Sequence, residues 1–157
     1  MTRTLSLLAV LCLLAFSAAA QPLVSYTKAN AKFDDVRDDL KTAIEAKGLV
    51  IDYQAFIGRM LDRTGKDVGS AKPLYADAQA LQFCSAQLSR KTMEADPANV
   101  AMCPYTIVVY ATADQPDRVV VAYRRPLRPG SSPASRHALR QVDALLDELA
   151  RQAVGRR

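Results

Sequence analysis

Histidine is nearly absent from this chain of 157 residues, which contains His137 alone. Any Ser-His-Asp or Cys-His mechanism would have to use this residue. It lies early in a predicted C-terminal helix, beside Arg136 and Arg140, and an imidazole near the amino end of a helix is disfavoured as a cation. No His-Glu-x-x-His sequence or paired metal-ligand spacing occurs. The sequence therefore assigns no catalytic residue and no metal site of these kinds.

Cysteine and glycine are also scarce, with three and six residues respectively. Cys12, Cys84 and Cys103 form no Cys-x-x-Cys pair. The usual thiol-redox motif and the Cys-x-x-Cys-His sequence of covalent haem attachment are therefore both missing. No glycine-rich phosphate loop follows a predicted strand. The sequence leaves enzymatic activity open and favours a protein without it.

The first 20 residues predict a secretory signal peptide. Residues 1–3 carry a positive charge, residues 5–16 form an apolar stretch, and residues 17–20 supply a small-residue cleavage site. A transmembrane helix would need about 20 apolar residues, more than this stretch contains. We therefore expect a mature protein that begins at Gln21, lacks Cys12, is periplasmic or secreted, and is not transmembrane.

The full chain has a formal net charge of +5. Cleavage would remove Arg3 and no acidic residue, which leaves 20 basic and 16 acidic side chains and a net charge of +4. Eight arginines lie from Arg124 onward and are interleaved with apolar residues, as is typical of a solvated helix face. Nucleic acid is not an expected partner after export. An anionic envelope surface or an acidic envelope protein suits this charge better.

Cys84 and Cys103 are the cysteines that remain after cleavage. An even pair in an oxidising compartment predicts a disulfide, which would stabilise the domain by roughly 3 kcal/mol through its closed loop. A second hypothesis stays open. Thiols and thioethers suit monovalent copper, so Cys84, Met102 and Cys103 would form a soft-metal or thiol-redox site. Because methionines usually fill gaps in cores, the main prediction includes no cofactor.

Hydrophobic periodicity predicts an alternation of strands and helices. After a first strand at residues 23–26, apolar residues three and four apart indicate a helix over residues 34–47, and Gly48 would end it. The pattern then predicts strands at residues 49–53 and 78–84, and helices within residues 54–63, over residues 86–95 and after Pro133. The predicted fold class is α+β, with a mixed or antiparallel sheet of about four or five strands. The order is β-α-β-α-β-α-β-β plus a C-terminal amphipathic helix.

Residues 103–126 predict a core hairpin around which this sheet is built. Two β-branched runs, at residues 106–111 and 118–125, flank a polar turn cluster at residues 114–117. Both runs contain consecutive apolar residues, so we expect both faces of the sheet to be covered. The C-terminal helix or a second copy of the chain would supply the second cover.

The ends of the two hairpin strands bring together one candidate ligand-binding site. Tyr105 lies at the head of the first strand, whereas Tyr123, Arg124 and Arg125 lie at the end of the second. The guanidinium groups would hold a carboxylate or phosphate, and Tyr105 would supply a hydroxyl. The alternative is that these residues simply form the rim of a strand pair.

The order and spacing of several motifs resemble the DUF302 family of small bacterial domains. These motifs are residues 33–36 with Leu40 and Ile44, residues 47–51, residues 95–97, and residues 103–126. The resemblance implies a compact α+β domain, often dimeric, with no established activity. It divides the chain into a signal peptide (1–20), a DUF302-like domain (21–126), and a linker with the C-terminal helix (127–157). Members without both cysteines are familiar, so the pair looks like an addition in an exported variant.

These features predict an exported binding or interaction module of α+β fold, stabilised by a disulfide. We expect a homodimer, formed through the sheet or the last helix. The other expected partners are a small ligand or an envelope protein.

Overall fold

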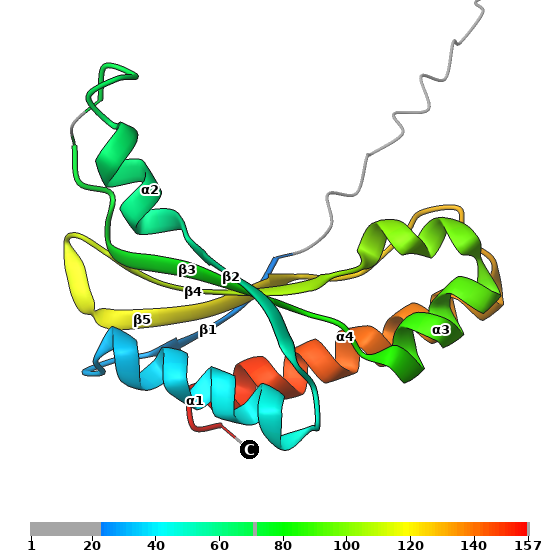
Figure 1. Ribbon diagram of the computed structural model, residues 1–157. Coiled ribbons are helices and arrows are strands. Elements are labelled where there is room, and N and C mark those ends of the chain that lie inside the picture. Colours follow the sequence, from blue (N-terminus) through cyan, green and yellow to red (C-terminus); the bar gives the residue numbers. More distant parts are fainter. Residues whose placement is uncertain (1–22, 71, 157) are drawn as a thin grey trace, which may run out of the picture.

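The computed structural model describes residues 23–70 and 72–156 and contains one five-stranded antiparallel sheet with helices packed on it. The predicted signal peptide and its cleavage site lie outside these residues. Spatial strand order is β1-β5-β4-β3-β2, so every neighbouring pair is antiparallel. The predicted α+β class and order of elements are confirmed (Figure 1).

The elements follow one another closely along the chain. They are β1 (Leu23–Lys28), α1 (Phe33–Ala46), β2 (Ile51–Phe56), α2 (Ile57–Thr64), β3 (Tyr75–Phe83), α3 (Ala86–Ala95), the 3-10 helix η1 (Pro97–Met102), β4 (Tyr105–Thr112), β5 (Gln115–Arg124) and α4 (Pro133–Ala153). The sequence pattern does not predict η1, in which Pro97 occupies the first turn and the side chain of Asp96 accepts a hydrogen bond from the Ala98 amide.

The two long helices form because their sequences combine apolar stripes with suitable ends. In α1 the buried residues recur three and four apart, and Asp34 and Asp35 in the first turn complement the helix dipole. Gly48, with φ of 70°, adopts the left-handed conformation that ends the helix. In α4 the hydroxyl of Ser132 accepts a hydrogen bond from the Ser135 amide. Both helices can therefore present an apolar face to the sheet.

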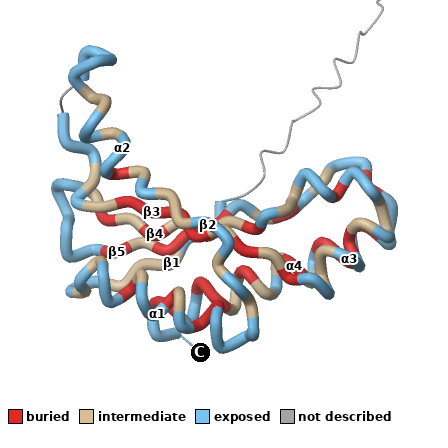
Figure 2. The backbone as a smooth tube through the Cα atoms, in the orientation of Figure 1, coloured by how far each residue is buried: buried red, intermediate tan, exposed pale blue. Residues whose placement is uncertain are grey.

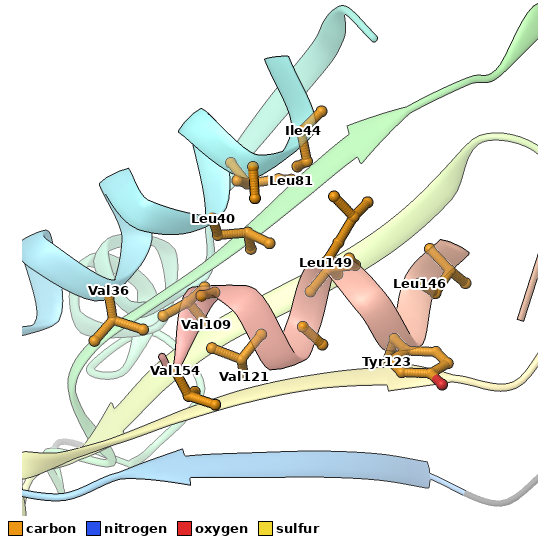
Figure 3. Close-up of a cluster of buried hydrophobic side chains, with 14 of the residues drawn as sticks. Val36, Leu40, Ile44, Leu81, Val109, Val121, Tyr123, Leu146, Leu149 and Val154 are labelled. Atoms are coloured by element: carbon orange, nitrogen blue, oxygen red, sulfur yellow. The ribbon is translucent and has the colours of Figure 1, made fainter. Parts of the chain in front are cut away.

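The core lies between these helices and one face of the sheet. Figure 1 shows α1 and α4 on the same side, and Figure 3 shows their side chains meeting those of β3, β4 and β5. The contributing residues include Leu40, Ile44, Leu81, Val109, Val121 and Leu149, none of which is exposed to solvent. The C-terminal helix is thus built into the centre of the domain.

The opposite face of the sheet, called the open face below, carries Val108, Tyr110, Val120 and Ala122. Along β4, buried residues alternate with half-buried ones, so each second side chain faces away from α1 and α4. The short helix α2 lies on this side, beside β3 (Figure 1). In the part of the chain that the structure describes, no long helix covers the open face. The expectation that the C-terminal helix covers a second face is therefore wrong, because α4 joins α1 on the first.

The hairpin connection is shorter than the sequence predicts. Thr112 pairs with Gln115, so the turn is Ala113 and Asp114, and β5 already includes Pro116. The neighbouring strand β1 reaches only as far as Val119. A proline is tolerated at this position because the strand end has no ladder bond to lose on that side.

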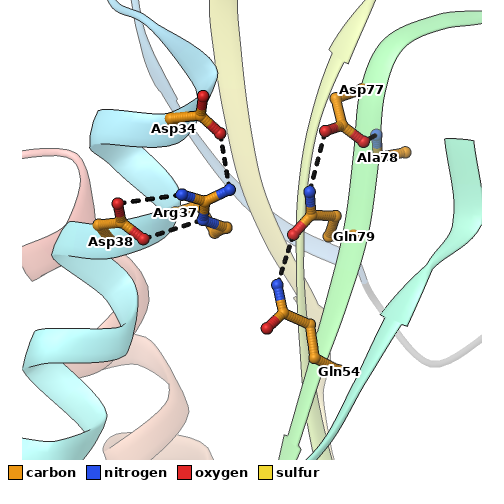
Figure 4. Close-up of polar contacts among 7 residues, drawn as sticks. All are labelled: Asp34, Arg37, Asp38, Gln54, Asp77, Ala78 and Gln79. Atoms are coloured by element: carbon orange, nitrogen blue, oxygen red, sulfur yellow. Dashed lines mark hydrogen bonds and ion pairs between the residues drawn. The ribbon is translucent and has the colours of Figure 1, made fainter. Parts of the chain in front are cut away.

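One polar cluster is built into the core-facing side of the sheet. Gln79, which is 1% exposed, donates to Asp77 at 2.9 Å and accepts from Gln54 at 2.6 Å. Across from it, Arg37 on α1 pairs with Asp34 and Asp38 (Figure 4). Because the side-chain amide of Gln79 is hydrogen-bonded through both its oxygen and its nitrogen, its burial leaves neither group without a partner.

Candidate functional site

A groove lies where β4 begins and β5 ends. Its volume is about 470 Å³, and its walls come from β1, η1, β4, β5, α4 and the segment after β5. Tyr105, Tyr123, Arg124 and Arg125 all line it. The structure thus brings the four predicted site residues together at one place, and their role in ligand binding stays a prediction.

The floor of the groove is largely apolar. Val108 and Ala122, which pair across β4 and β5, belong to the open face and line it. Met102 and Pro104 form one wall at the end of η1, and Leu23, which is 62% exposed, forms part of another. A ligand lying here would lose apolar surface to protein contact, which favours binding by about 25 cal/mol per Å².

Two arginines, Arg124 and Arg125, line the groove where β5 ends, a position called the rim below. Arg124 ends β5 and is exposed. Arg125 lies 3.4 Å from Asp143 on α4, which holds one side of its guanidinium and leaves 41% of its side chain exposed. Within the described ranges no ion pair holds Arg124. The rim therefore offers at least one cation without a protein counter-ion.

The two tyrosine hydroxyls point away from the groove. Tyr105 lies on the core face, 3% exposed, with its hydroxyl 3.2 Å from that of Ser89 on α3. Tyr123, also on the core face, donates to Asp143 at 3.2 Å. Odd-numbered residues of both strands face α1 and α4, so the Tyr105 hydroxyl lies on the core side, and its role toward a ligand stays a prediction.

Asp143 and Asp147 lie one turn apart on α4 and bind side chains at and near the rim. Asp147 accepts from Tyr26 at 2.5 Å and pairs with Arg151 at 3.0 Å, whereas Asp143 contacts both Tyr123 and Arg125. Burial, followed by the charges of the two aspartates, raises the pKa of Tyr123. No sequence pattern used above predicts a role for this acidic pair. Its signal was two acids four residues apart in an arginine-rich helix.

Cys84 and Cys103 are free thiols in the structure and are not within bonding distance, so the predicted disulfide is not formed. The register of β3 and β4 explains why the two cysteines are not directly opposite each other. Phe83 pairs with Tyr105, so the next residue, Cys84, would face Pro104 and not Cys103. The thiols are nevertheless neighbours. Burial, followed by a side-chain hydrogen bond with Cys103, raises the pKa of Cys84 to about 12. Ser89 Oγ lies 3.6 Å from Cys103 Sγ.

The residues of the soft-metal hypothesis are only partly assembled. Cys84 and Cys103 are adjacent, whereas Met102 lines the groove and Cys84 does not. Among the described residues no group of three His, Cys, Asp or Glu side chains could hold a metal ion. His137 is exposed on α4, with a ring nitrogen 3.1 Å from the side chain of Gln141.

Fold and groove together define a class of small α+β domain, in which two helices back one face of an antiparallel sheet and the other face stays open. The sequence profile of DUF302, described as a domain of unknown function, matches residues 25–153. The chain belongs to the DUF302 family. The match runs through α4, so the family domain includes the C-terminal helix.

The crystal structure of an uncharacterized conserved DUF302 protein from Bacillus stearothermophilus has the same fold. It is 14% identical in sequence, with a TM-score of 0.67 over 82% of this chain and 97% of that one. No curated protein matches the chain. None of the helices in residues 23–70 and 72–156 is long and apolar enough to span a bilayer.

Proposed function

We propose that this DUF302 protein is an exported, non-enzymatic binding module whose groove takes an amphiphilic anion, that is, a carboxylate or phosphate joined to an apolar body. The observation that carries this proposal is that Arg124 and Arg125 both line a groove with an apolar floor. Arginine forms two parallel hydrogen bonds with carboxylate or phosphate, which fixes the position of the anionic group.

The chemistry of the rim favours binding over catalysis. A guanidinium keeps its proton throughout the physiological pH range, so Arg124 and Arg125 can hold an anion without transferring a proton to it. The tyrosine hydroxyls, which could exchange protons, are hydrogen-bonded behind the sheet, to Asp143 and to Ser89. The groove therefore presents fixed positive charge and apolar surface to its ligand.

The support behind the rim holds Arg125 in place before a ligand arrives. Asp143 contacts its guanidinium and is itself fixed by the hydroxyl of Tyr123. A side chain already ordered in the free protein loses less conformational entropy on binding, which would otherwise cost about 0.5–1.5 kcal/mol. Arg124 supplies the cation that is free to adapt to the ligand.

Calorimetric titration with decanoate tests this function. We expect saturable binding of decanoate and weaker or no binding of decanol, which lacks the charge, and of acetate, which lacks the apolar body. Arg124→Ala should weaken the affinity roughly tenfold, since a hydrogen bond to a charged group contributes about 1.5 kcal/mol or more. Arg118→Ala, on the same strand but at its other end, should leave the affinity unchanged.

Equal binding by the Arg124→Ala and Arg118→Ala variants would contradict the assignment of the anionic group to the rim. Absence of decanoate binding by the unmodified protein would contradict the proposed function itself.

A homodimer formed through the open face is part of the proposal. The apolar stripe of α4 is buried in its own core, so α4 is not available as an interface. On the open face, Tyr110 and Val120 pair across β4 and β5 and are both half-buried. A second copy packed there would remove this apolar surface from water and would leave the groove at the border of the interface.

Export remains a proposal based on the first 20 residues. Mass spectrometry of protein recovered from the cell envelope would show a chain beginning at Gln21 if the predicted cleavage occurs. The same measurement counts free thiols and bound copper. Two thiols with bound copper would favour the second candidate function, soft-metal binding, for which the adjacency of Cys84 and Cys103 is the supporting observation.

A further inference from the structure

We propose that Cys84 and Cys103 form a reversible dithiol–disulfide couple that sets the affinity of the groove for its ligand. This inference rests on the proposed binding function, because it concerns the regulation of the same site. It goes beyond a structural disulfide, since the bond is expected to form and break reversibly and to change the affinity of the groove for its ligand.

The position of Cys103 connects the thiols to the groove wall. Cys103 lies between Met102 and Pro104, and both of these neighbours line the groove. Cys84 lies directly after β3, outside the groove lining. A bond between the two sulfurs would therefore join the wall formed by the end of η1 to the central sheet.

Ser89 on α3 makes a second connection between the thiols and the groove. Its hydroxyl lies 3.6 Å from Cys103 Sγ and 3.2 Å from the hydroxyl of Tyr105, the first residue of β4. Tyr105 also stacks edge to face on Phe83, the last residue of β3. When Cys103 turns toward Cys84, Ser89 loses a partner beside the residue at which β4 enters the groove.

The chemistry of the couple is thiol–disulfide exchange. Cys103 attacks a disulfide of an oxidising partner and forms a mixed disulfide, whereupon one sulfur of the partner leaves as a thiol. Cys84 then attacks Cys103 Sγ, the Cys84–Cys103 bond forms, and the second sulfur of the partner leaves. The protein loses two protons and two electrons, and the partner's disulfide becomes two thiols. A dithiol reductant reverses the sequence.

The half-burial of both thiols suits this role. Each is partly accessible, so a small disulfide can reach it. Burial keeps the thiol of Cys84 protonated at neutral pH, since its pKa is raised to about 12. The first attack therefore falls to Cys103, and Cys84 acts as the resolving thiol.

Closing the bond should tighten the groove. A disulfide holds its two Cβ atoms about 3.8 Å apart, so the segment from Met102 to Pro104 would be tethered to the end of β3. A wall that is tethered before binding loses less freedom when the ligand enters. The oxidised protein should therefore bind the amphiphilic anion more tightly than the reduced protein.

The test compares decanoate affinity in the two redox states of the full chain carrying Cys12→Ser, in which Cys84 and Cys103 are the only thiols. We expect the oxidised form to bind about threefold more tightly than the form kept in a phosphine reductant. Because coupling between two sites is reciprocal, saturating decanoate should also stabilise the disulfide against glutathione by the same factor, equivalent to about 14 mV.

Controls separate this inference from the function on which it rests. Cys84→Ser and Cys103→Ser variants should bind decanoate like the reduced protein, with no response to glutathione disulfide beyond a mixed disulfide. Equal affinities in the two redox states, or failure of the intramolecular bond to form, would overturn the coupling and leave the binding function standing. Absence of decanoate binding in both states would overturn both.

Discussion

At the scale of single residues, the domain depends on hydrogen bonds made by buried and partly buried polar side chains. Tyr26 and Tyr123 donate to carboxylates of α4, and Asn99 joins three helical segments. Each such hydrogen bond contributes modestly to the free energy of unfolding. Removal of one partner is costly, because the other partner is left without a hydrogen bond in a low-dielectric environment. Substitutions at these positions should therefore lower the free energy of unfolding. Substitution of Tyr123 should also change how the free energy of unfolding depends on pH.

Tyr123→Phe should flatten the loss of stability at alkaline pH. Burial and the charges of Asp143 and Asp147 hold the pKa of Tyr123 above its ordinary value, so the folded protein keeps this proton after the unfolded chain has lost it. Above about pH 10 the unfolded state binds fewer protons, and the free energy of unfolding falls as the pH rises. Phenylalanine has no proton to lose, so this contribution disappears.

Urea denaturation at several pH values between about 9 and 11.5 measures how steeply the free energy of unfolding falls with pH. Tyr53→Phe is the matched control, since Tyr53 is 60% exposed. An alkaline slope that is the same in the Tyr123→Phe variant and the unmodified protein would show that Tyr123 is not held protonated by its surroundings.

Asn99→Ala should destabilise the domain by about 1–3 kcal/mol. Its amide is 1% exposed and donates at 2.8 Å both to the carbonyl oxygen of Thr92 on α3 and to the hydroxyl of Ser135 on α4. Chemical denaturation gives the change in the free energy of unfolding. Val100→Ala in the same 3-10 helix is the control, because Val100 is 58% exposed. A loss no larger than that of the control would mean that η1 is not anchored through Asn99.

At the scale of elements, α4 is the segment whose role changes most between sequence and structure. The sequence treats it as an addition after the family-like region, whereas the structure packs it beside α1 on the core face. Its apolar stripe was visible in the sequence, but periodicity does not say what a stripe packs against. Deleting residues 132–157 would therefore remove part of the core and not merely a peripheral helix.

Leu149→Ala should cost about 2–5 kcal/mol, the usual range for a buried leucine in a core. Leu149 is fully buried between α1 and the sheet (Figure 3). Arg140→Ala, on the exposed side of the same helix, should change the free energy of unfolding by no more than about 0.5 kcal/mol. Thermal or urea unfolding distinguishes the two. Near-equal effects would place α4 outside the cooperative core.

Element positions follow from the sequence where one periodicity is strong. The helix predicted at residues 34–47 is observed at Phe33–Ala46, and α3 is observed at its predicted positions. The strand predicted at residues 49–53 is β2, Ile51–Phe56, because an apolar run does not show where pairing with β3 begins. The 3-10 helix η1 gave no periodic signal beyond Pro97.

The candidate site was predictable in place but not in detail. Finding a hairpin between residues 106 and 125 was enough to bring Tyr105 close to Arg124. The face of the strand on which each residue lies depends on which side of the sheet packs against α1 and α4. Two apolar runs without alternation do not show which side that is. The tyrosine hydroxyls therefore could not be placed, nor could the aspartates behind them, which belong to a helix distant in sequence.

At the scale of the whole molecule, one face of the sheet is committed to the core and the other remains available. Figure 2 shows the buried residues concentrated in the sheet and on the sides of α1 and α4 that face it. Val108, Tyr110 and Val120 on the open face are only half-buried. The groove and the proposed dimer interface both use this face, so ligand binding and association would occur side by side.

Val120→Glu should convert the proposed dimer to a monomer. A carboxylate on the open face would be desolvated against the same residue of a second copy, and burying an unpaired charge is strongly unfavourable. Light scattering after size-exclusion chromatography gives the mass. Arg140→Glu changes charge in the same direction on α4 and should leave the mass unaltered. A Val120→Glu variant that keeps the mass of the unmodified protein would exclude the open face as the interface.

In the proposed function, an amphiphilic anion occupies the groove between β4, β5 and η1. Amide chemical shifts recorded by NMR during titration with decanoate test it most directly. We predict saturable shifts confined to the groove, at residues such as Met102, Thr106, Ala122 and Arg124. Shifts confined instead to β2 and α2, around Tyr53 and Arg63, with the groove signals unmoved, would contradict it.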